Sequence, residues 1–373
     1  MKFKINKTDF YQAIQNVIGV VPVKTTIPIL GNVLLHLEEN NLTLTGTDLE
    51  VSISTRMKVQ GEVDGGVAIP AKVLFEIVRE LPDIPMELEC NEEDHKITIT
   101  TEKGFYRLSG EAKEDFPKIS IEESEEYFLI DSELLARMID KTLFAVSTDE
   151  LRTTLMGVYL QVMEKELRMV STDGHRLVKI VDKKFNSAEF QKDMIIPTKA
   201  LNLLLKNIQS NEKTKVNLSE DHVVFELGDT TILSKCIEGQ FPNYERVIPL
   251  DNDKKVVINR ELLSSSVRRV AIFSNSITHQ IRFCISQDNV KIQSEDIEFG
   301  GEAEESIGAE YQGDDLEIGY NANYILDILR HLETDEVMFK VKDATSAGIV
   351  YPGNQREDED LLMLLMPIRL NED

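Results

Sequence analysis

The segment LRMVSTDGHRLVKI at residues 167–180 decides the fold, because the chain contains related versions of it at two other places. These are LTLTGTDLEVSI at residues 42–53 and VKIQSEDIEFGGEA at residues 290–303. Each version is typical of a strand with a turn in it. Asp48, Asp173 and Asp296 correspond, at separations of 125 and 123 residues. Such a spacing is that of a whole domain rather than of a short repeat unit.

Two helical segments recur with the same spacing. The first opens on a capping-type residue, at Asn6, Asp131 and Asn259, and then carries apolar residues at helical spacing. The second covers residues 69–83, 196–209 and 319–333, and its middle copy has one apolar stripe made of Leu201, Leu204, Leu205 and Ile208. Between the helices, alternating segments at residues 96–110 and 215–235 predict antiparallel hairpins.

The sequence therefore predicts an α+β fold of three similar domains, each with antiparallel sheet and two helices. Acidic, turn-rich stretches at residues 120–127 and 249–255 mark where one copy ends. We place the domains at residues 1–124, 125–252 and 253–373. Repetition alone leaves open whether the domains form an extended array or a closed ring.

The composition limits the cellular setting and the kind of partner. Among 373 residues, 41 are basic and 66 acidic, so the net charge of −25 argues against a protein that grips DNA with its whole surface. A basic face can still coexist with an acidic exterior. Cys90, Cys236 and Cys284 lack CxxC spacing, so we expect reduced thiols. The N-terminus has no signal-peptide core and no apolar run is long enough for a membrane span, which predicts a cytoplasmic protein.

Basic residues recur at matching places on the second helix. Lys72 and Arg79 correspond to Lys199 and Lys206, and each pair is seven residues apart, so it lies on one helix face. The first helices add Arg137, Lys141, Arg268 and Arg269. An ordinary solvated face is the alternative, and Ala322 and Leu329 at the matching places weaken the pattern in the third copy. Contacts of this kind would be to phosphates and would be salt-sensitive.

Catalytic motifs are not indicated. STDGHRL at residues 171–177 holds serine, aspartate and histidine, but neighbours on one strand and its turn point in divergent directions. Asp173 and Gly174 form a hairpin-turn signal that explains the aspartate without chemistry. The sequence contains no P-loop, GxGxxG fingerprint, HExxH motif or EF-hand loop, and its histidines lack metal-ligand spacing, so we expect no cofactor and no metal.

Five motifs together resemble the bacterial sliding clamp family, the beta subunits of DNA polymerase III. They are TIPIL at residues 26–30, LTGTDLE at 44–50, STDGHRL at 171–177, FPNYERVIP at 241–249 and MPIRL at 366–370, and the match covers essentially the whole chain. The resemblance implies a head-to-tail homodimer that forms a ring of six domains, with helices lining the hole. Such a ring encircles duplex DNA without sequence specificity and makes replication processive, as a processivity factor rather than an enzyme.

The resemblance also implies which residues carry the function. The DNA-facing residues would be Lys24, Lys72, Arg79, Arg137, Lys141, Arg152, Lys199, Lys206 and Arg269. At the dimer interface, the strand Phe105, Tyr106, Arg107 and Leu108 would meet Ile272 and Phe273. A pocket for short linear motifs would be formed by Leu155, Thr172, Gly174, His175, Arg176, Leu177, Pro242, Arg246, Val247, Leu364, Met366, Pro367, Ile368 and Arg369, with arginine and histidine on its rim.

The partners implied are double-stranded DNA, the DNA polymerase III catalytic subunit, the clamp loader, and other polymerases and repair proteins that carry clamp-binding motifs. The residues Asn371, Glu372 and Asp373 would bring negative charge near the pocket. Two other hypotheses remain: a general protein-interaction scaffold without a DNA role, and a hydrolase that uses the STDGH segment.

Overall fold

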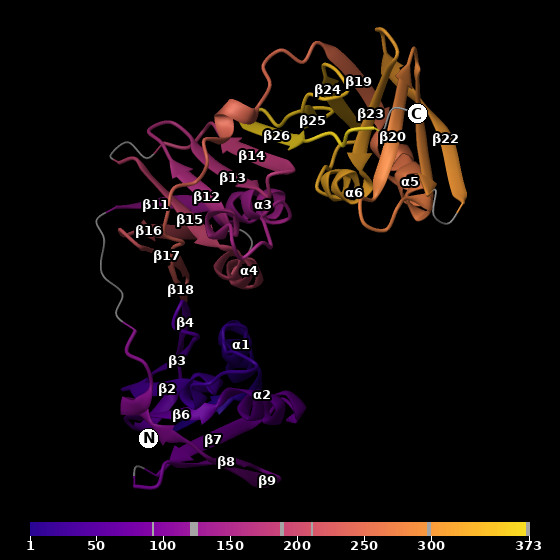
Figure 1. Cartoon of the computed structure of the whole chain (residues 1–373). Helices are drawn as coiled ribbons and strands as arrows, with labels where there is room; N and C mark the ends of the chain where they lie inside the picture. Colours follow the sequence, from indigo (N-terminus) through magenta and orange to yellow (C-terminus); the bar gives the residue numbers. More distant parts are fainter. Residues whose placement is uncertain (92, 120–125, 187–189, 210–211, 297–299, 371–373) are drawn as a thin grey trace. The chain divides into compact units, whose positions relative to one another are not determined.

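A computed structural model describes residues 1–91, 93–119, 126–186, 190–209, 212–296 and 300–370 (Figure 1). The residues 371–373, for which the sequence suggested an effect on the pocket, lie outside this part of the chain. Contacts group the chain into two compact units: unit 1 holds residues 1–136 and 196–236, and unit 2 holds residues 137–195 and 237–373. Among the described residues, every helix is too short or too polar to cross a membrane.

Unit 1 contains two antiparallel sheets. In spatial order, the five-stranded sheet consists of β5 (Gln60–Val63), β1 (Lys2–Asn6), β7 (Pro85–Cys90), β8 (Lys96–Thr101) and β9 (Gly104–Ser109). The nine-stranded sheet consists of β10 (Glu111–Ala112), β6 (Gly65–Pro70), β2 (Asn32–Glu38), β3 (Asn41–Thr47), β4 (Val51–Lys58), β18 (Thr230–Lys235), β17 (His222–Leu227), β16 (Lys213–Leu218) and β11 (Tyr127–Asp131).

Unit 2 is built on one long antiparallel sheet. Its twelve strands, in spatial order, are β15 (Lys192–Pro197), β12 (Gly157–Val162), β13 (Leu167–Thr172), β14 (Arg176–Asp182), β26 (Glu359–Leu365), β25 (Gly348–Pro352), β24 (Glu336–Val341), β19 (Lys254–Asn259), β22 (Gly301–Tyr311), β21 (Asn289–Asp296), β20 (Gln280–Ser286) and β23 (Leu316–Asn321).

Each repeat contributes two α-helices, which confirms the predicted α+β class. They are α1 (Lys7–Ile18), α2 (Ala71–Glu80), α3 (Ser132–Leu143), α4 (Thr198–Asn207), α5 (Arg260–Val270) and α6 (Ala322–Arg330). In unit 1, α1 packs on α2 and on strands of both sheets; in unit 2, α5 packs on α6 and on β21 and β22. The caps Asp131 and Asn259 accept hydrogen bonds from backbone N–H groups of the first turn, whereas the side chain of Asn6 makes no capping bond.

The α4 stripe differs in part from its prediction. Leu201 and Leu204 are fully buried as expected, while Leu205 is only half-buried. Leu203 is buried instead, and Asn207 donates a hydrogen bond to the Asn16 carbonyl of α1. The helix is therefore buried on two sides, because α1 packs against a second face that its own repeat does not predict.

The repeats are joined by continuous sheet. In unit 1, β4 of the first repeat pairs with β18 of the second, and in unit 2, β14 of the second pairs with β26 of the third. Ser52 lies opposite Leu233, as Leu177 lies opposite Leu364. The middle repeat is thus shared between the two units, since it pairs with a neighbour on each side.

Candidate functional site

The turn between β13 and β14 is held by a closed set of hydrogen bonds. The Thr172 hydroxyl donates to the Arg176 carbonyl at 2.6 Å and accepts from the Gly174 N–H at 3.0 Å. One oxygen of Asp173 accepts from the backbone N–H groups of His175 and Arg176, at 2.9 and 3.0 Å. Gly174 has a φ of +90°, in the left-handed region that favours glycine. The STDGHRL motif therefore encodes a rigid turn.

Its serine, aspartate and histidine do not form a catalytic relay. Ser171 is buried, and its hydroxyl donates to the Thr142 carbonyl at 2.6 Å. The second carboxylate oxygen of Asp173 lies 3.0 Å from Nε of Arg176, and the His175 ring stacks beside Tyr324 with the centroids 6.2 Å apart. A nucleophile must touch its base, and these contacts point each group elsewhere.

Three of the predicted pocket residues share one apolar cluster in unit 2. Leu177 on β14 lies opposite Leu364 on β26, and both are buried with Leu155. The other buried members of the cluster are Val170, Ile195, Phe241, Tyr244, Ile349 and Leu362. Val247 and Met366 are exposed by 53% and 40%, so apolar groups near this cluster remain open to a partner.

Phe241 and Tyr244 were missing from the predicted pocket although they belong to its FPNY motif. The Phe241 ring stacks on Tyr159 with the centroids 4.7 Å apart. The Tyr244 hydroxyl donates to Gln161 at 2.6 Å and accepts from Arg168 at 3.2 Å. The sequence carries a signal for them, because both aromatic residues flank Pro242, which is itself a predicted pocket residue.

Arg176, predicted to lie on the pocket rim, has mostly intramolecular contacts in this structure, and its role at the pocket stays a prediction. Its side chain is 10% exposed and forms ion pairs with Asp173 at 3.0 Å and Asp327 at 2.7 Å. It also donates to the Phe144 carbonyl at 2.7 Å and lies over the Tyr324 ring. A guanidinium with these contacts braces the turn against α6.

The remaining predicted pocket residues lie in the turn between β13 and β14, in residues 242–246 and in the C-terminal segment. Thr172 is buried in the turn, while Gly174, His175, Pro242, Arg246 and Arg369 are exposed and Pro367 is half-buried. The Met366 N–H donates to the His175 carbonyl at 2.8 Å, which attaches the C-terminal segment to the turn. Ile368 donates its N–H to the Gly319 carbonyl of β23 at 2.8 Å and so fastens this segment to the third repeat.

Most of the predicted DNA-facing residues are exposed. In unit 1, Lys24, Lys72, Arg79, Lys199 and Lys206 are accessible, and Lys199 forms an ion pair with Asp48. In unit 2, Arg152 and Arg269 keep about half of their surface while pairing with Asp149 and Glu305. Such partly satisfied cations on helices and loops can still contact phosphates.

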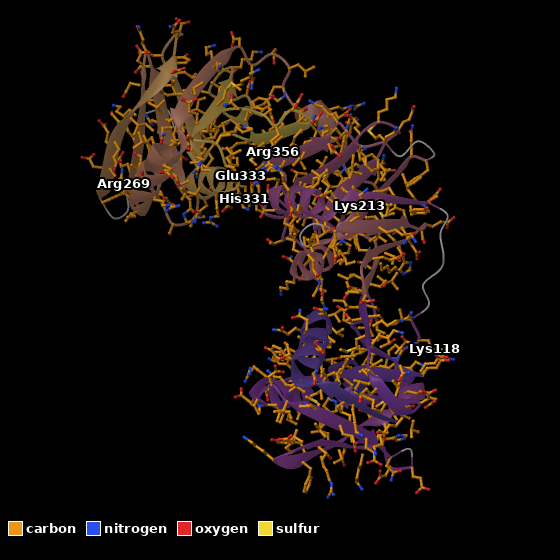
Figure 2. The ribbon with its side chains drawn as sticks, turned by 180° about the vertical axis from the view of Figure 1, so that it is seen from behind. Lys118, Lys213, Arg269, His331, Glu333 and Arg356 are labelled. Carbon is orange, nitrogen blue, oxygen red and sulfur yellow. The ribbon has the colours of Figure 1, made fainter. Side chains whose placement is uncertain are left out.

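Arg137 and Lys141, also predicted to face DNA, are instead mostly buried in ion pairs in this structure, and their DNA role stays a prediction. Both bind Glu333, at 2.6 and 2.8 Å, and Arg137 also binds Glu359 at 2.6 Å. Arg356 also binds Glu333, at 2.9 Å, and Figure 2 labels these two residues. The side chain of Lys141 is 4% exposed and that of Arg137 is 13% exposed. The two cations tie α3 to the third repeat and present little charge to solvent.

Glu333 is the centre of this ion-pair cluster. Partial burial by itself would raise the pKa of Glu333, but the hydrogen bond and charge of Lys141, with the charge of Arg137, outweigh burial and lower the pKa to about 2. Glu333 is therefore ionised at neutral pH and holds the two cations in place.

Four of the residues predicted at the dimer interface are exposed aromatic or aliphatic groups, while Arg107 is an exposed cation and Leu108 is half-buried. Ile272 is 77% exposed and Phe105 is 61% exposed, with Phe273 and Tyr106 near 40%. β9 is the last strand of its sheet, and among described residues it pairs only with β8. The first part of β22 pairs on one side with β21, and Phe273 lies close to Gly301 of that strand.

Comparisons with known proteins cover the full chain. Models of the DNA polymerase III beta subunit match its N-terminal domain at residues 1–120, its central domain at 129–243 and its C-terminal domain at 245–369. The chain is 34% identical to the beta sliding clamp of Pseudomonas aeruginosa, over 99% of this chain and 100% of that protein. It is 32% identical to that of Chlamydia muridarum, over 100% of both.

Solved structures agree with the sequence matches. The crystal structure of a DnaN sliding clamp from Bartonella birtlesii, bound to griselimycin, has a TM-score of 0.94 and 33% identity, covering 99% of this chain and 100% of that one. The likeness extends through all three repeats and both helices of each. The chain therefore belongs to the DNA polymerase III beta subunit family, the bacterial sliding clamps.

Proposed function

We propose that this chain closes around duplex DNA as a head-to-tail homodimer and holds the replicative polymerase there through the apolar cluster of unit 2. The observation that carries the proposal is the match to the family over all three repeats. Its domains are proposed to be residues 1–124, 125–252 and 253–373. The clamp is proposed to work in the cytoplasm, without a catalytic site of its own.

Ring closure is supported by the two unpaired strand edges. An exposed edge is prone to uncontrolled pairing, and closure of β9 of one copy against β22 of the next would satisfy both. Arg107 on β9 and Glu302 and Glu304 on β22 have opposite charge, which favours this pairing over that of two identical edges. Ile272 and Phe273 would lose their exposed apolar surface at the same seam.

The DNA-facing surface is proposed to consist of Lys24, Lys72, Arg79, Arg152, Lys199, Lys206 and Arg269. Contacts from these residues to phosphates would carry no sequence information, which suits a ring that slides. The overall charge of −25 then limits DNA binding to the basic helices.

The motif-binding site is proposed to combine the apolar cluster with His175, Val247 and Met366. Leucine, phenylalanine and tyrosine of this cluster would give an apolar surface suited to an aliphatic or aromatic anchor, and a flexible methionine can adapt to different motifs. The proposed occupants are the DNA polymerase III catalytic subunit, the clamp loader, and other polymerases and repair proteins with such motifs.

Retention on DNA tests the proposal. The protein is loaded with a clamp loader onto nicked circular duplex, the DNA is then cut, and release is followed. Rapid loss after cutting is the expected result, because a ring can slide off an end. Retention that does not depend on ends would mean direct binding, and failure to load would favour a protein-interaction scaffold.

A further inference from the structure

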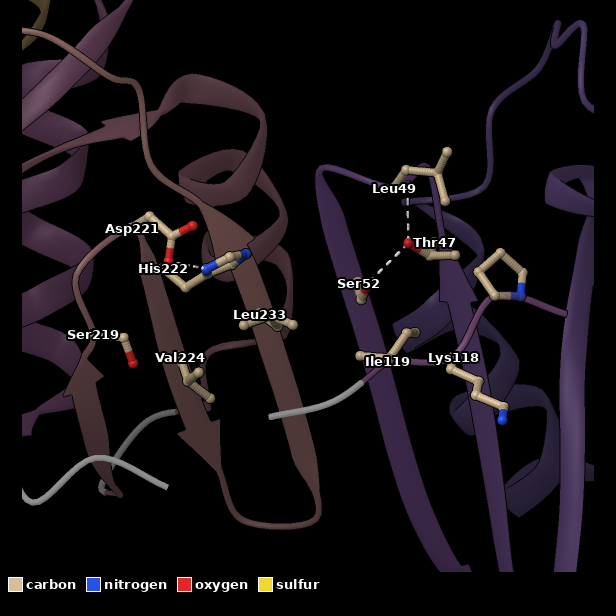
Figure 3. A pocket seen from close by; sticks show the side chains of 11 residues that line it. Thr47, Leu49, Ser52, Lys118, Ile119, Ser219, Asp221, His222, Val224 and Leu233 are labelled. Atoms are coloured by element: carbon tan, nitrogen blue, oxygen red, sulfur yellow. Dashed lines mark hydrogen bonds and ion pairs between the residues drawn. The ribbon is translucent and has the colours of Figure 1, made fainter. Parts of the chain in front are cut away.

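A second pocket lies in unit 1, where β4 pairs with β18 (Figure 3). Its volume is about 310 Å³, at the lower end of the range for ligand pockets. Leu49, Val224 and Leu233 provide apolar surface, and Lys118 and His222 are among the polar residues that line it.

This pocket occupies the same register as the apolar cluster of unit 2. In unit 1, Ser52 on β4 pairs with Leu233 on β18, and Leu233 pairs with Val224 on β17. In unit 2, the corresponding strands are β14, β26 and β25. The two sets are Ser52, Leu233 and Val224, and Leu177, Leu364 and Ile349. The pocket is thus the counterpart, one repeat earlier, of the site proposed to bind linear motifs.

The adjoining turn repeats the hydrogen bonds of the unit 2 turn. The Thr47 hydroxyl donates to the Val51 carbonyl and accepts from the Leu49 N–H, both at 3.0 Å. One oxygen of Asp48 accepts from the Glu50 and Val51 N–H groups, at 3.0 and 2.7 Å. Donors and acceptors stand at the same four places as between Thr172 and Arg176, so both turns are rigid in the same way.

Leu49 stands where the unit 2 turn has glycine. Its φ is +80°, a conformation that strains a residue with a Cβ atom, and 56% of its surface is exposed. Backbone strain and an exposed apolar side chain both lower the stability of the fold. The structure nevertheless keeps a leucine at this position, where it lines the pocket. Strained residues of this kind are concentrated at functional sites.

We propose that this pocket is a second docking site, for a short linear peptide of a partner protein that carries an aliphatic residue followed by an acidic one. The aliphatic side chain would contact Leu49, Val224 and Leu233. The acidic one would pair with Lys118, for which the described part of the chain provides no ion pair. Asp221, also in the lining, makes a polyanion a poor occupant. The class of ligand rests on the peptide role proposed for the unit 2 cluster.

Methyl NMR of the full-length protein tests the proposal, with leucine and valine methyl groups labelled. The probe is a blocked tetrapeptide with leucine followed by aspartate between two glycines. We expect it to shift the signals of Leu49, Val224 and Leu233. Leu49→Gly and Lys118→Glu should each weaken this binding about fivefold, as expected for loss of partial burial or of an ion pair. Glu50→Ala, a matched control on the same turn, should leave it unchanged.

The signals of Leu155 and Leu364 report the unit 2 site in the same spectra. Shifts confined to those two residues would overturn the second site and leave the first intact. Pocket shifts that neither variant weakens would also overturn it, because the peptide would then bind elsewhere. An absence of shifts at both sets would overturn this inference and count against the peptide role of the unit 2 cluster.

Discussion

Leu49 and Gly174 occupy the same place in two copies of one turn, with φ angles of +80° and +90°. Glycine adopts this conformation at little cost, whereas leucine has a Cβ atom that crowds the backbone. The four hydrogen bonds around Asp48 hold the turn closed despite this strain. The same turn position therefore suits Gly174 in the second repeat and strains the backbone of Leu49 in the first.

We predict that Leu49→Gly stabilises the protein by about 1 kcal/mol, because removing left-handed strain outweighs the added freedom of the unfolded chain. Chemical denaturation measured by circular dichroism would show a higher midpoint with an unchanged slope. Leu49→Ala, which removes the side chain and keeps the strain, serves as the control and should not be stabilised. A lower midpoint for Leu49→Gly would contradict the assignment of strain.

His175→Ala tests the STDGH segment directly. The proposed function gives this exposed ring a part in capturing a peptide. On that proposal we expect about fivefold weaker binding of the DNA polymerase III catalytic subunit, measured by surface plasmon resonance. The turn should stay intact, because its bonds involve the His175 backbone and not the ring. If the protein hydrolysed a substrate and this variant lost that activity, the result would support the hypothesis of a hydrolase that uses the STDGH segment.

At the scale of elements, the first and second helices of the repeats use their basic residues differently. The second helices α2 and α4 expose Lys72 and Lys206 to solvent. The first helix of the middle repeat, α3, directs Arg137 and Lys141 into the ion-pair cluster with Glu333. Basic residues on the first helix of the middle repeat therefore do not form one surface with those of α2 and α4, because the third repeat supplies α3 with acidic partners.

The ion-pair cluster predicts a pH dependence of stability. The pKa of Glu333 is about 2 in the folded protein, below the ordinary value of 4.5. A carboxyl with a lowered pKa stabilises the fold fully above its unfolded pKa, and this contribution is lost as pH falls from about 4.5 towards 2. Thermal unfolding of the Glu333→Gln variant should therefore lose part of this pH dependence.

At neutral pH, Glu333→Gln should cost about 2 kcal/mol, because Lys141 would keep a buried charge without its main partner. Glu310→Gln on β22 is a matched control, since Glu310 is exposed, and should have little effect. Equal stability of the two variants at pH 7 would show that the cluster is not structural.

The basic face of α2 and α4 predicts salt-dependent DNA affinity. In the double variant Lys72→Ala and Lys206→Ala, the slope of log affinity against log salt should fall by about 0.9 for each phosphate that the protein no longer neutralises. Fluorescence anisotropy with short duplexes of several sequences would measure this. Lys255→Ala on β19 removes an exposed lysine outside the helices and should leave the slope unchanged. Equal slopes for both proteins would exclude α2 and α4 from the DNA surface.

At the scale of the whole molecule, unpaired strand edges and exposed apolar residues indicate how two copies of the chain associate. β9 ends one sheet with Phe105 and Tyr106 exposed, and Ile272 and Phe273 lie next to β22. Neither edge has a partner among the described residues of the chain, so a second copy is the partner that symmetry offers.

We predict that replacing both Ile272 and Phe273 by alanine gives a folded monomer. The seam would lose its two apolar anchors, and anchors of this kind dominate the free energy of association. Light scattering at micromolar concentration would report a single chain, while circular dichroism would be unchanged. Leu250→Ala, at a residue 97% exposed, is the control and should remain dimeric. A double variant that is still dimeric would refute the seam.

Several sequence patterns with a local cause are confirmed, although the Asn6 side chain makes no capping bond. The hairpins at residues 96–110 and 215–235, the caps Asp131 and Asn259, and the turn around Asp173 all follow from neighbouring residues. Leu155, Leu177 and Leu364, which the family resemblance assigns to one pocket, share one buried cluster although they are far apart in the chain, and their pocket role stays a prediction. Phe241 and Tyr244 belong to the FPNYERVIP motif of that resemblance, but only packing shows that they join the cluster.

The sequence by itself determined the threefold repeat, the α+β class and the family, because helical period, strand alternation and turn residues are written in order along the chain. Only the tertiary structure decided that Arg137 and Lys141 are buried in ion pairs, that Arg176 braces a turn, and that a second pocket lies beside Leu49. Each of these depends on a residue from another repeat, and the distance between repeats in space is not encoded in any local pattern.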